Sequence, residues 1–217
     1  MEKPPQKEIA LEARASAEGR LFSPSAARNQ GPIRDAFLRT MPSAGVIVEV
    51  GSGTGEHVAH LAAAAPGLFF RPGDPDPASR ASIAAWTAHL GLANVAAPHE
   101  ADVTHADWHL FFGRADGVVS INMIHIAPFE AAAGLIAGAG QLLGAGGRLF
   151  LYGPFSRDGV HAASSNADFD ASLKSRDPRW GVRDLERQIA PLAKACGFAL
   201  EEIIDMPANN LVAVFSK

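Results

Sequence analysis

A glycine-rich turn is the feature of this sequence best suited to holding a ligand. It reads Gly51-Ser52-Gly53-Thr54-Gly55 and follows the apolar run from Val46 to Val50, which has the pattern of a strand buried on both faces. Glycines between a strand and a helix allow positive φ angles and let a ligand approach the backbone closely. We therefore expect a bound ligand to lie against this turn.

The spacing of the glycines restricts the kind of ligand. A dinucleotide fingerprint reads G-x-G-x-x-G, whereas Gly51, Gly53 and Gly55 give G-x-G-x-G, with Glu49 two residues before the first glycine. No G-K-[S/T] follows for a phosphate loop, and Val50 stands where a G-x-S-x-G nucleophile elbow needs glycine. The spacing thus argues against a nicotinamide-dependent oxidoreductase, a phosphate loop and a serine hydrolase.

The run from Glu49 to Gly55 resembles motif I of the class I S-adenosylmethionine-dependent methyltransferases. The resemblance implies S-adenosylmethionine as cofactor and S-adenosylhomocysteine as product. This ligand carries no phosphate, and a carboxylate at Glu49 can accept from its ammonium and offset its cationic sulfur. We therefore expect Glu49, Gly51, Ser52, Gly53 and Gly55 to contact the cofactor.

The same resemblance implies further cofactor contacts. Asp74 follows the second predicted strand, where a carboxylate can accept from both ribose hydroxyls, and Asp76 either shares this role or caps the next helix. Asp102 and the Val103 amide stand where the family commonly holds adenine, although Asp102 could also be an ordinary loop or N-cap acid. The other expected contacts are Arg28, Asn29, His57, Asn122 and Met123. For Arg28 and Asn29, helix capping is the alternative.

Short segments spread over nearly the whole chain carry a closer resemblance. They are Ser25–Asn29, Asn122–Ile126, Tyr152–Phe155, Ser165–Asn166, Phe169–Asp170, Trp180–Asp184 and Met206–Asn210. These segments are similar to the uncharacterised methyltransferase-like family called domain of unknown function 938 (DUF938). This resemblance implies a fold and a cofactor but no substrate. Gly73 departs from the family pattern, where serine is expected, which loosens the turn and leaves Asp74 in place.

Two residues are candidates for the chemistry. Methyl transfer is an in-line displacement in which the protein mainly aligns the reactants and excludes water. His125, just past the fourth predicted strand, could accept a proton near pH 7, or it could pack beneath the cofactor or cap the following turn. Tyr152, at the end of the fifth strand, could orient a substrate or pack in the core.

A long polar stretch, residues 154–181, shows no clear periodicity and is interpreted as an irregular recognition loop, with a surface insertion as the alternative. Two asparagines in the turn Pro207–Asn210 could face the same mouth, although turn formation alone explains them. The candidate substrate contacts are Arg157, His161, Asn166, Phe169, Asn209 and Asn210.

Strands and helices alternate along the chain, which predicts an α/β fold: a Rossmann-like three-layer sandwich with a seven-stranded, mostly parallel sheet and an antiparallel last strand. The expected strands are 46–50, 68–71, 95–97, 117–122, 148–152, 200–206 and 211–215. The expected helices are two short ones before the first strand, then 56–64, 79–90, 129–143 and 183–195.

We predict a single domain over residues 1–217. Residues 1–44 would form an N-terminal extension and capping helices, with residues 1–20 as a loose extension or a short helix. Residues 45–217 would form the Rossmann-like core that carries the recognition loop.

The composition is that of a soluble globular protein, with 47% hydrophobic and 19% charged residues. The net charge is −4 without a basic run, so we do not expect nucleic acid as a partner. The one cysteine, Cys196, excludes an internal disulfide, and we expect no metal because His105 and His109 lack a third ligand. Met1–Ala10 lacks the apolar segment of a secretory signal, and the uncharged run Ala131–Gly147 is too short to span a membrane. We expect a cytoplasmic monomer or homodimer.

The leading hypothesis is therefore a methyltransferase that acts on a small molecule or a protein. Base methylation is disfavoured, because Asn122–His125 lacks the Asn-Pro-Pro-aromatic run that holds a flipped base. The alternative is a non-catalytic module that binds S-adenosylmethionine and scaffolds a partner, since a fold fixes a ligand without fixing turnover.

Overall fold

The computed structural model describes residues 14–217, and a six-stranded sheet forms its centre. The strands are β3 (Gly45–Val50), β4 (Leu68–Gly73), β5 (Ala115–Ile121), β6 (Leu143–Gly153), β10 (Ala199–Met206) and β11 (Asn210–Ser216). Their order across the sheet is β10-β11-β6-β5-β3-β4. The neighbours from β4 to β6 are parallel, and β11 runs antiparallel to both β6 and β10. The predicted α/β fold with a mainly parallel sheet is confirmed.

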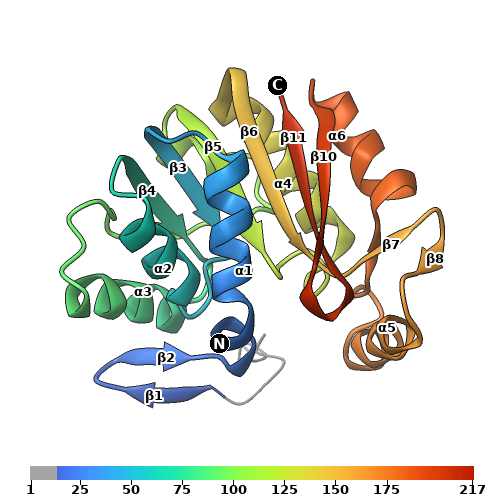
Figure 1. Cartoon of the computed structure of the whole chain (residues 1–217), viewed down its shortest axis with the longest axis horizontal. Coiled ribbons are helices and arrows are strands. Elements are labelled where there is room, and N and C mark those ends of the chain that lie inside the picture. Colours follow the sequence, from blue (N-terminus) through green and yellow to red (C-terminus); the bar gives the residue numbers. More distant parts are fainter. Residues whose placement is uncertain (1–13) are drawn as a thin grey trace, which may run out of the picture.

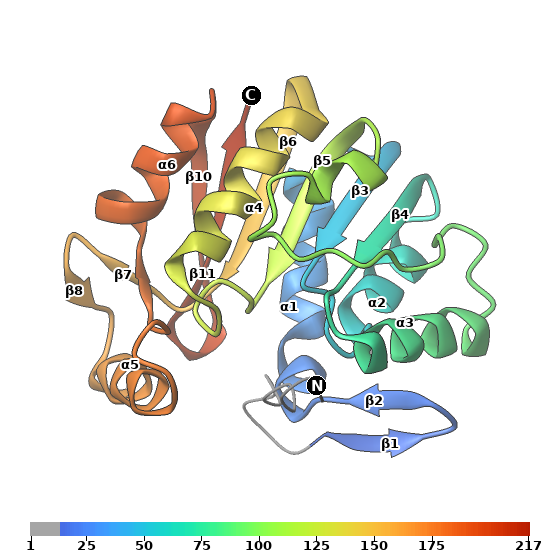
Figure 2. The same cartoon turned by 180° about the vertical axis from the view of Figure 1, so that it is seen from behind.

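Helices cover both faces of the sheet (Figures 1 and 2). One face carries α1 (Pro24–Thr40), α2 (Glu56–Ala64) and α3 (Pro77–His89), and the other carries α4 (Phe129–Leu142) and α6 (Ala190–Ala195). Successive residues of a strand point to opposite faces. On β6, Leu149 and Leu151 therefore pack with α4, whereas Phe150 and Tyr152 pack on the α1 face.

The sheet has six strands, not the seven predicted. The segment expected as a third strand, around Val95, forms only isolated parallel bridges to the edge of β4, at Phe70 and Gly73. Pro72 in β4 and Pro98 in the facing segment lack an amide hydrogen, so a continuous ladder cannot form there.

The region before the sheet is one helix, where two were predicted. Ser23 caps α1, accepting from the Ala26 amide. The helix then continues through Pro32, because burial of Ile33 and Phe37 against the sheet outweighs the local helix-breaking preference.

A short hairpin precedes α1, formed by β1 (Ala15–Ala17) and β2 (Arg20–Phe22). It lies alongside α3, where the Leu21 amide donates to Ser82 Oγ (2.7 Å) and the Trp86 indole donates to the Leu21 carbonyl (3.0 Å). The prediction of a loose extension or helix is therefore wrong for residues 14–20. The rest of this prediction concerns residues 1–13, which lie outside the described residues. The segment Met1–Ala10, considered above as a secretory signal, is among them.

The stretch 154–181 is ordered rather than irregular. It contains β7 (Phe155–Arg157), β8 (Val160–His161) and α5 (Ser164–Arg176), and it leads into β9 (Arg183–Asp184), which pairs with β7. The buried positions of α5 are Asn166, Asp170 and Leu173. Their spacing is helical, but two of the three are polar, so a search for apolar periodicity misses the helix.

The predicted helix 183–195 is divided. Asp184 caps a π-helical turn, Leu185–Ile189, which continues into α6. The predicted antiparallel pair at the C-terminal end is confirmed, with the turn Pro207–Asn209 joining β10 to β11. Within residues 14–217 no helix combines the length and apolar character needed to cross a bilayer.

Candidate functional site

The candidate site lies at the carboxyl edge of the sheet. Because β3 to β6 are parallel, the glycine turn, Asp74, Asn122 and Gly153 all follow strand ends on this edge. The beginning of α1, the β10–β11 turn and α5 lie at the same edge, which is the lower edge in Figure 1. The fold thus brings together most of the residues selected from the sequence.

The glycine turn is tightly held. The amides of Gly51 and Ser52 donate to the Gly73 carbonyl at 2.9 and 3.2 Å. Gly51, Gly53 and Gly55 have φ values of +70°, +55° and +84°. A Cβ atom at Gly51 would lie 2.6 Å from Met123 Cγ, whereas one at Gly53 would meet nothing closer than 3.9 Å. The backbone is therefore closed in at Gly51 and open at Gly53.

Asp74 joins this turn to the end of β4. Its Oδ2 accepts from the Gly53 amide (2.8 Å), and its Oδ1 accepts from the Asp76 amide (2.9 Å). Burial raises the pKa of Asp74, while these two hydrogen bonds oppose the rise. A carboxylate has about four acceptor positions, so Asp74 can still accept two hydroxyl groups.

Asp76 has a structural role that accounts for its carboxylate. It caps α3, accepting from the Ala78 amide (3.3 Å) and from the Ser79 amide (2.9 Å) and hydroxyl (2.8 Å). Burial alone would raise its pKa, but these hydrogen bonds outweigh burial and hold the pKa below its usual value. Of the two alternatives that the sequence left open, the structure shows helix capping.

Glu49 is a buried acid with an unused acceptor. Its side chain is 2% exposed, and Oε2 has no hydrogen-bond partner among the described residues. Burial raises the pKa of Glu49 to about 8, the charge of Asp74 adds to this rise, and a hydrogen bond with the Ser52 side chain opposes it. A buried acceptor without a donor is unfavourable, so the site is suited to a ligand that brings a donor, such as an ammonium.

His125 lies in the loop that follows β5. It is 3% exposed, its ring packs edge-on against Phe169 of α5 with centroids 5.8 Å apart, and Nδ1 has no partner among residues 14–217. Burial lowers the pKa of His125 to about 3, and the charge of Arg183 adds to this effect. The imidazole is therefore neutral at physiological pH.

The loop that carries His125 is fastened by Arg183, a residue that the sequence did not single out for the site. This buried guanidinium donates to the carbonyls of Ile124 (2.9 Å), Ala127 (2.6 Å) and Arg179 (3.0 Å). The Gly181 amide also donates to the His125 carbonyl (3.0 Å). One arginine in a short segment has no periodicity, so no sequence pattern could have predicted this role.

Tyr152 gathers asparagine side chains from two elements. Its hydroxyl oxygen accepts from Asn29 Nδ2 of α1 (3.4 Å) and from Asn210 Nδ2 of β11 (3.0 Å). Asn166 Nδ2 of α5 donates to the neighbouring Asn209 carbonyl (3.1 Å). Predicted cofactor, catalytic and substrate residues thus meet in one cluster.

The other predicted cofactor contacts differ in burial and in hydrogen bonding. Asp102 Oδ1 accepts from the Thr104 amide (3.0 Å) and hydroxyl (2.7 Å), which is the loop alternative. Val103 is buried. His57 is half-buried in α2, where burial lowers its pKa to about 4. Arg28 is exposed on α1.

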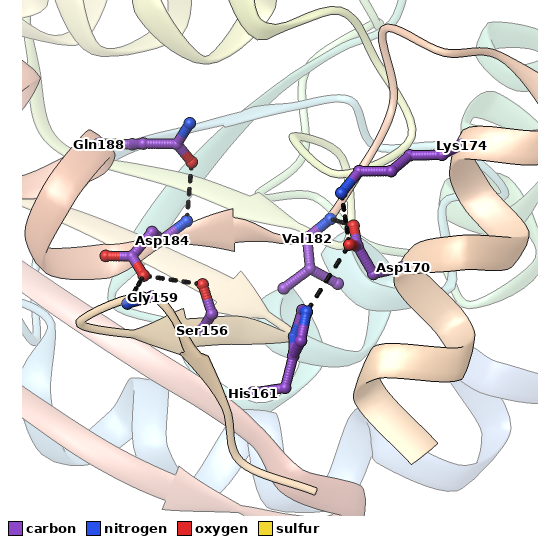
Figure 3. A network of polar contacts seen from close by, with 8 residues as sticks. All are labelled: Ser156, Gly159, His161, Asp170, Lys174, Val182, Asp184 and Gln188. Carbon is purple, nitrogen blue, oxygen red and sulfur yellow. Dashed lines mark hydrogen bonds and ion pairs between the residues drawn. The ribbon is translucent and has the colours of Figure 1, made fainter. Parts of the chain in front are cut away.

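Two predicted substrate residues take part in ion pairs of the 154–181 stretch. The exposed Arg157 pairs with Glu186. His161 Nε2 lies 3.6 Å from Asp170 Oδ2, and Asp170 also accepts from Lys174 Nζ (2.5 Å) and the Val182 amide (2.8 Å) (Figure 3). These contacts tie α5 to the segment before β9.

A second acid in the same region, Asp184, joins β9 to the β7–β8 hairpin. It accepts from Ser156 Oγ (2.9 Å) and the Gly159 amide (2.6 Å), as Figure 3 shows.

The described residues contain no group of three or more His, Cys, Asp or Glu side chains that could hold a metal ion.

Residues 20–217 match the family described as "Protein of unknown function (DUF938)". The chain belongs to the DUF938 family. The resemblance found in the sequence is thereby confirmed, and it covers the glycine turn, the His125 loop and Tyr152 with its asparagine partners in this DUF938 protein.

The fold of this DUF938 protein is shared with solved methyltransferases. An O-methyltransferase family protein from Burkholderia thailandensis has a TM-score of 0.74 at 18% identity, covering 89% of this chain and 57% of its own. An O-methyltransferase family 2 protein from Planctomyces limnophilus, in complex with apigenin, has a TM-score of 0.74 at 18% identity, covering 89% of this chain and 60% of its own. Human N-acetylserotonin methyltransferase in complex with SAM has a TM-score of 0.70 at 14% identity, covering 89% of this chain and 52% of its own. This chain therefore matches little more than half of each solved chain.

Proposed function

We propose that this DUF938 protein transfers a methyl group from S-adenosylmethionine to a small molecule. The observation that carries the proposal is the open glycine backbone at Gly53, which is joined to Asp74, together with the buried Glu49 Oε2, which has no partner among the described residues. An exposed backbone, a carboxylate with free acceptor positions and a buried acceptor without a donor suit an adenosyl group linked to an amino acid.

Each of these groups would have its own role toward the cofactor. Asp74 would accept from the ribose hydroxyls, and Glu49 would accept from the ammonium, which gives its buried Oε2 a donor. Gly51, Ser52, Gly53 and Gly55 would line the cofactor with backbone. When bound, S-adenosylmethionine supplies an electrophilic methyl group on a cationic sulfur.

His125 would accept the hydrogen bond of the group that becomes methylated. It is neutral at physiological pH, so its imidazole can accept without first losing a proton. A pKa of about 3 makes it a weak base, because general-base catalysis works best when the pKa is near the working pH. Its main contribution would therefore be to orient the acceptor, while Phe169 shields the ring from water.

A small-molecule acceptor is supported by the solved structures that share this fold, which include a complex with apigenin and an N-acetylserotonin methyltransferase. No observation in residues 14–217 favours the alternative, a non-catalytic module that scaffolds a partner.

Transfer of a radioactive methyl group tests the proposal. The protein is incubated with methyl-tritiated S-adenosylmethionine and a cell extract, and the label is measured in protein-free and acid-precipitated fractions. We expect label in the protein-free fraction, with calorimetry showing binding of S-adenosylhomocysteine but not of NAD. Binding without transfer to any fraction would instead support the scaffold, and binding of NAD alone would contradict both.

A further inference from the structure

The Tyr152 cluster, defined as Tyr152, Asn29 and Asn210, lies beside the proposed cofactor site rather than in it. Tyr152 ends β6, and one strand, β5, separates β6 from β3 and its glycine turn. Neighbouring strands are ~4.8 Å apart, so the end of β6 is about 10 Å along the sheet edge from the turn. The cluster is thus placed where a second ligand could lie.

Hydrogen bonding in the cluster leaves one donor and one acceptor unused. Tyr152 is 1% exposed and its oxygen accepts from two amide groups, but no acceptor for its own hydroxyl proton is found among the described residues. Asn29 Oδ1 is also buried there without a partner. Unpaired buried polar groups are unfavourable, and a ligand that brings an acceptor and a donor would satisfy both.

The cluster contains no charge. Within residues 14–217, no charged side chain hydrogen-bonds to Tyr152, Asn29 or Asn210, and Arg28 beside Asn29 is exposed. An ionised group brought against Tyr152 would lose its hydration without gaining a counter-ion. An uncharged group would lose much less.

The backbone next to Asn210 is strained. Ala208 and Asn209 have φ values of +59° and +57°, a region that residues other than glycine rarely adopt. The Asn209 carbonyl is held by Asn166 in this conformation, and Asn210 then reaches Tyr152. A glycine turn would join two strands without this cost, and strain of this kind is concentrated at binding sites.

We infer that the Tyr152 cluster binds the methyl acceptor, and that this acceptor is an uncharged polar molecule presenting both a hydrogen-bond donor and an acceptor, as a hydroxyl or carboxamide group does. The inference rests on the proposed function and adds the chemical class of the substrate. Tyr152 would donate to the acceptor molecule, and Asn29 would receive from it.

The test begins with methyl-tritiated S-adenosylmethionine and a protein-free metabolite extract. After the reaction, the mixture is passed at pH 7 over cation and anion exchangers, and the cationic cofactor is retained. We expect the transferred label in the flow-through. Label retained as an anionic or cationic product would overturn the inference.

Variants then connect the product to the cluster. Tyr152→Phe and Asn210→Asp should each lower transfer at least tenfold, while the dissociation constant of S-adenosylhomocysteine stays within twofold. Gln141→Glu, which adds the same charge on the exposed surface of α4, should leave both quantities unchanged. Circular dichroism establishes whether each variant is folded. If Tyr152→Phe is unfolded, the result for Asn210→Asp alone tests the role of the cluster.

The remaining outcomes separate the two proposals. Unchanged transfer in Asn210→Asp would show that the cluster does not bind the methyl acceptor, which overturns the inference. A tenfold loss of S-adenosylhomocysteine affinity in that variant would assign the cluster to the cofactor and also overturn the inference. If wild-type protein binds S-adenosylhomocysteine but transfers no label, the methyltransferase proposal itself fails.

Discussion

The Gly53 amide donates a 2.8 Å hydrogen bond to Asp74 Oδ2, which joins two residues 21 positions apart in the chain. This bond holds the most open part of the glycine turn against the end of β4. A ligand that lies on the turn therefore also meets the carboxylate, so binding depends on both residues.

Exchange of Asp74 should affect binding more than exchange of its neighbour Asp76. We expect Asp74→Ala to weaken S-adenosylhomocysteine binding by about 1–3 kcal/mol, the usual effect of leaving polar ligand groups unpaired. Asp76→Ala removes the N-cap of α3 and should lower the free energy of unfolding by ~1 kcal/mol with little effect on binding. Calorimetry and urea unfolding measure the two quantities. Equal losses of affinity in both variants would show that Asp76 also binds the ligand.

Glu49 should make the unliganded protein less stable as the pH rises. Its pKa is about 8 in the folded protein and 4.5 when exposed, so the folded state favours the protonated acid. Stability from this group is complete below pH 4.5 and is lost as the pH rises from 4.5 through 8, by an amount on the order of 5 kcal/mol.

Glu49→Gln should remove this pH dependence. Urea unfolding of both proteins at pH 5 and pH 8 measures the effect, and the difference between variant and wild type cancels the contributions of other titrating groups. We expect the variant to gain stability relative to wild type at pH 8. A constant difference between the two pH values would contradict the buried, protonated Glu49.

His125 should support transfer without titrating in the working range. We expect the wild-type rate to show no loss from protonation of this imidazole between pH 6 and 8, because its pKa is about 3. His125→Gln removes the ring that orients the methyl acceptor. We expect it to lower the rate by about 100-fold, the usual effect of a misplaced reactant, and to leave S-adenosylhomocysteine binding unchanged. His105→Gln, at an exposed position, is the matched control. The neutral imidazole would be refuted if the wild-type rate decreased at low pH with a midpoint near pH 6.5 and the His125→Gln variant did not show this decrease.

Arg183 should stabilise the His125 loop. Arg183→Met leaves the Ile124 and Ala127 carbonyls without this donor, and we expect the free energy of unfolding to fall by about 2–4 kcal/mol. Arg179→Met removes an exposed arginine whose ion pair with Asp177 is screened by water, and it should change stability much less. Urea unfolding distinguishes the two, and similar values for both variants would mean that the carbonyls find other donors.

The sequence was informative where local chemistry and packing agree. The apolar run before Gly51 and the glycine spacing predicted a strand and a tight turn, and both are present. The turn at Pro207–Asn210 likewise predicted the antiparallel pair. In these cases residues adjacent in the chain determine the structure.

The sequence was less informative where contacts between residues far apart in the chain determine the structure. Helix α5 buries Asn166 and Asp170, whose partners lie in other segments, so no apolar pattern marks it. Pro32 is a local helix breaker that packing overrides. The role of Arg183 depends on carbonyls of a loop more than fifty residues earlier, which only the folded chain brings near.

Calorimetric titration of S-adenosylhomocysteine into wild type, Gly53→Arg and Gly91→Arg measures whether the glycine turn holds the cofactor. Both glycines have positive φ, with open space around the missing side chain, but Gly91 lies beyond α3, away from the turn. We expect binding to wild type and Gly91→Arg and no binding to folded Gly53→Arg. Equal affinity in all three proteins, or no binding to wild type, would contradict it.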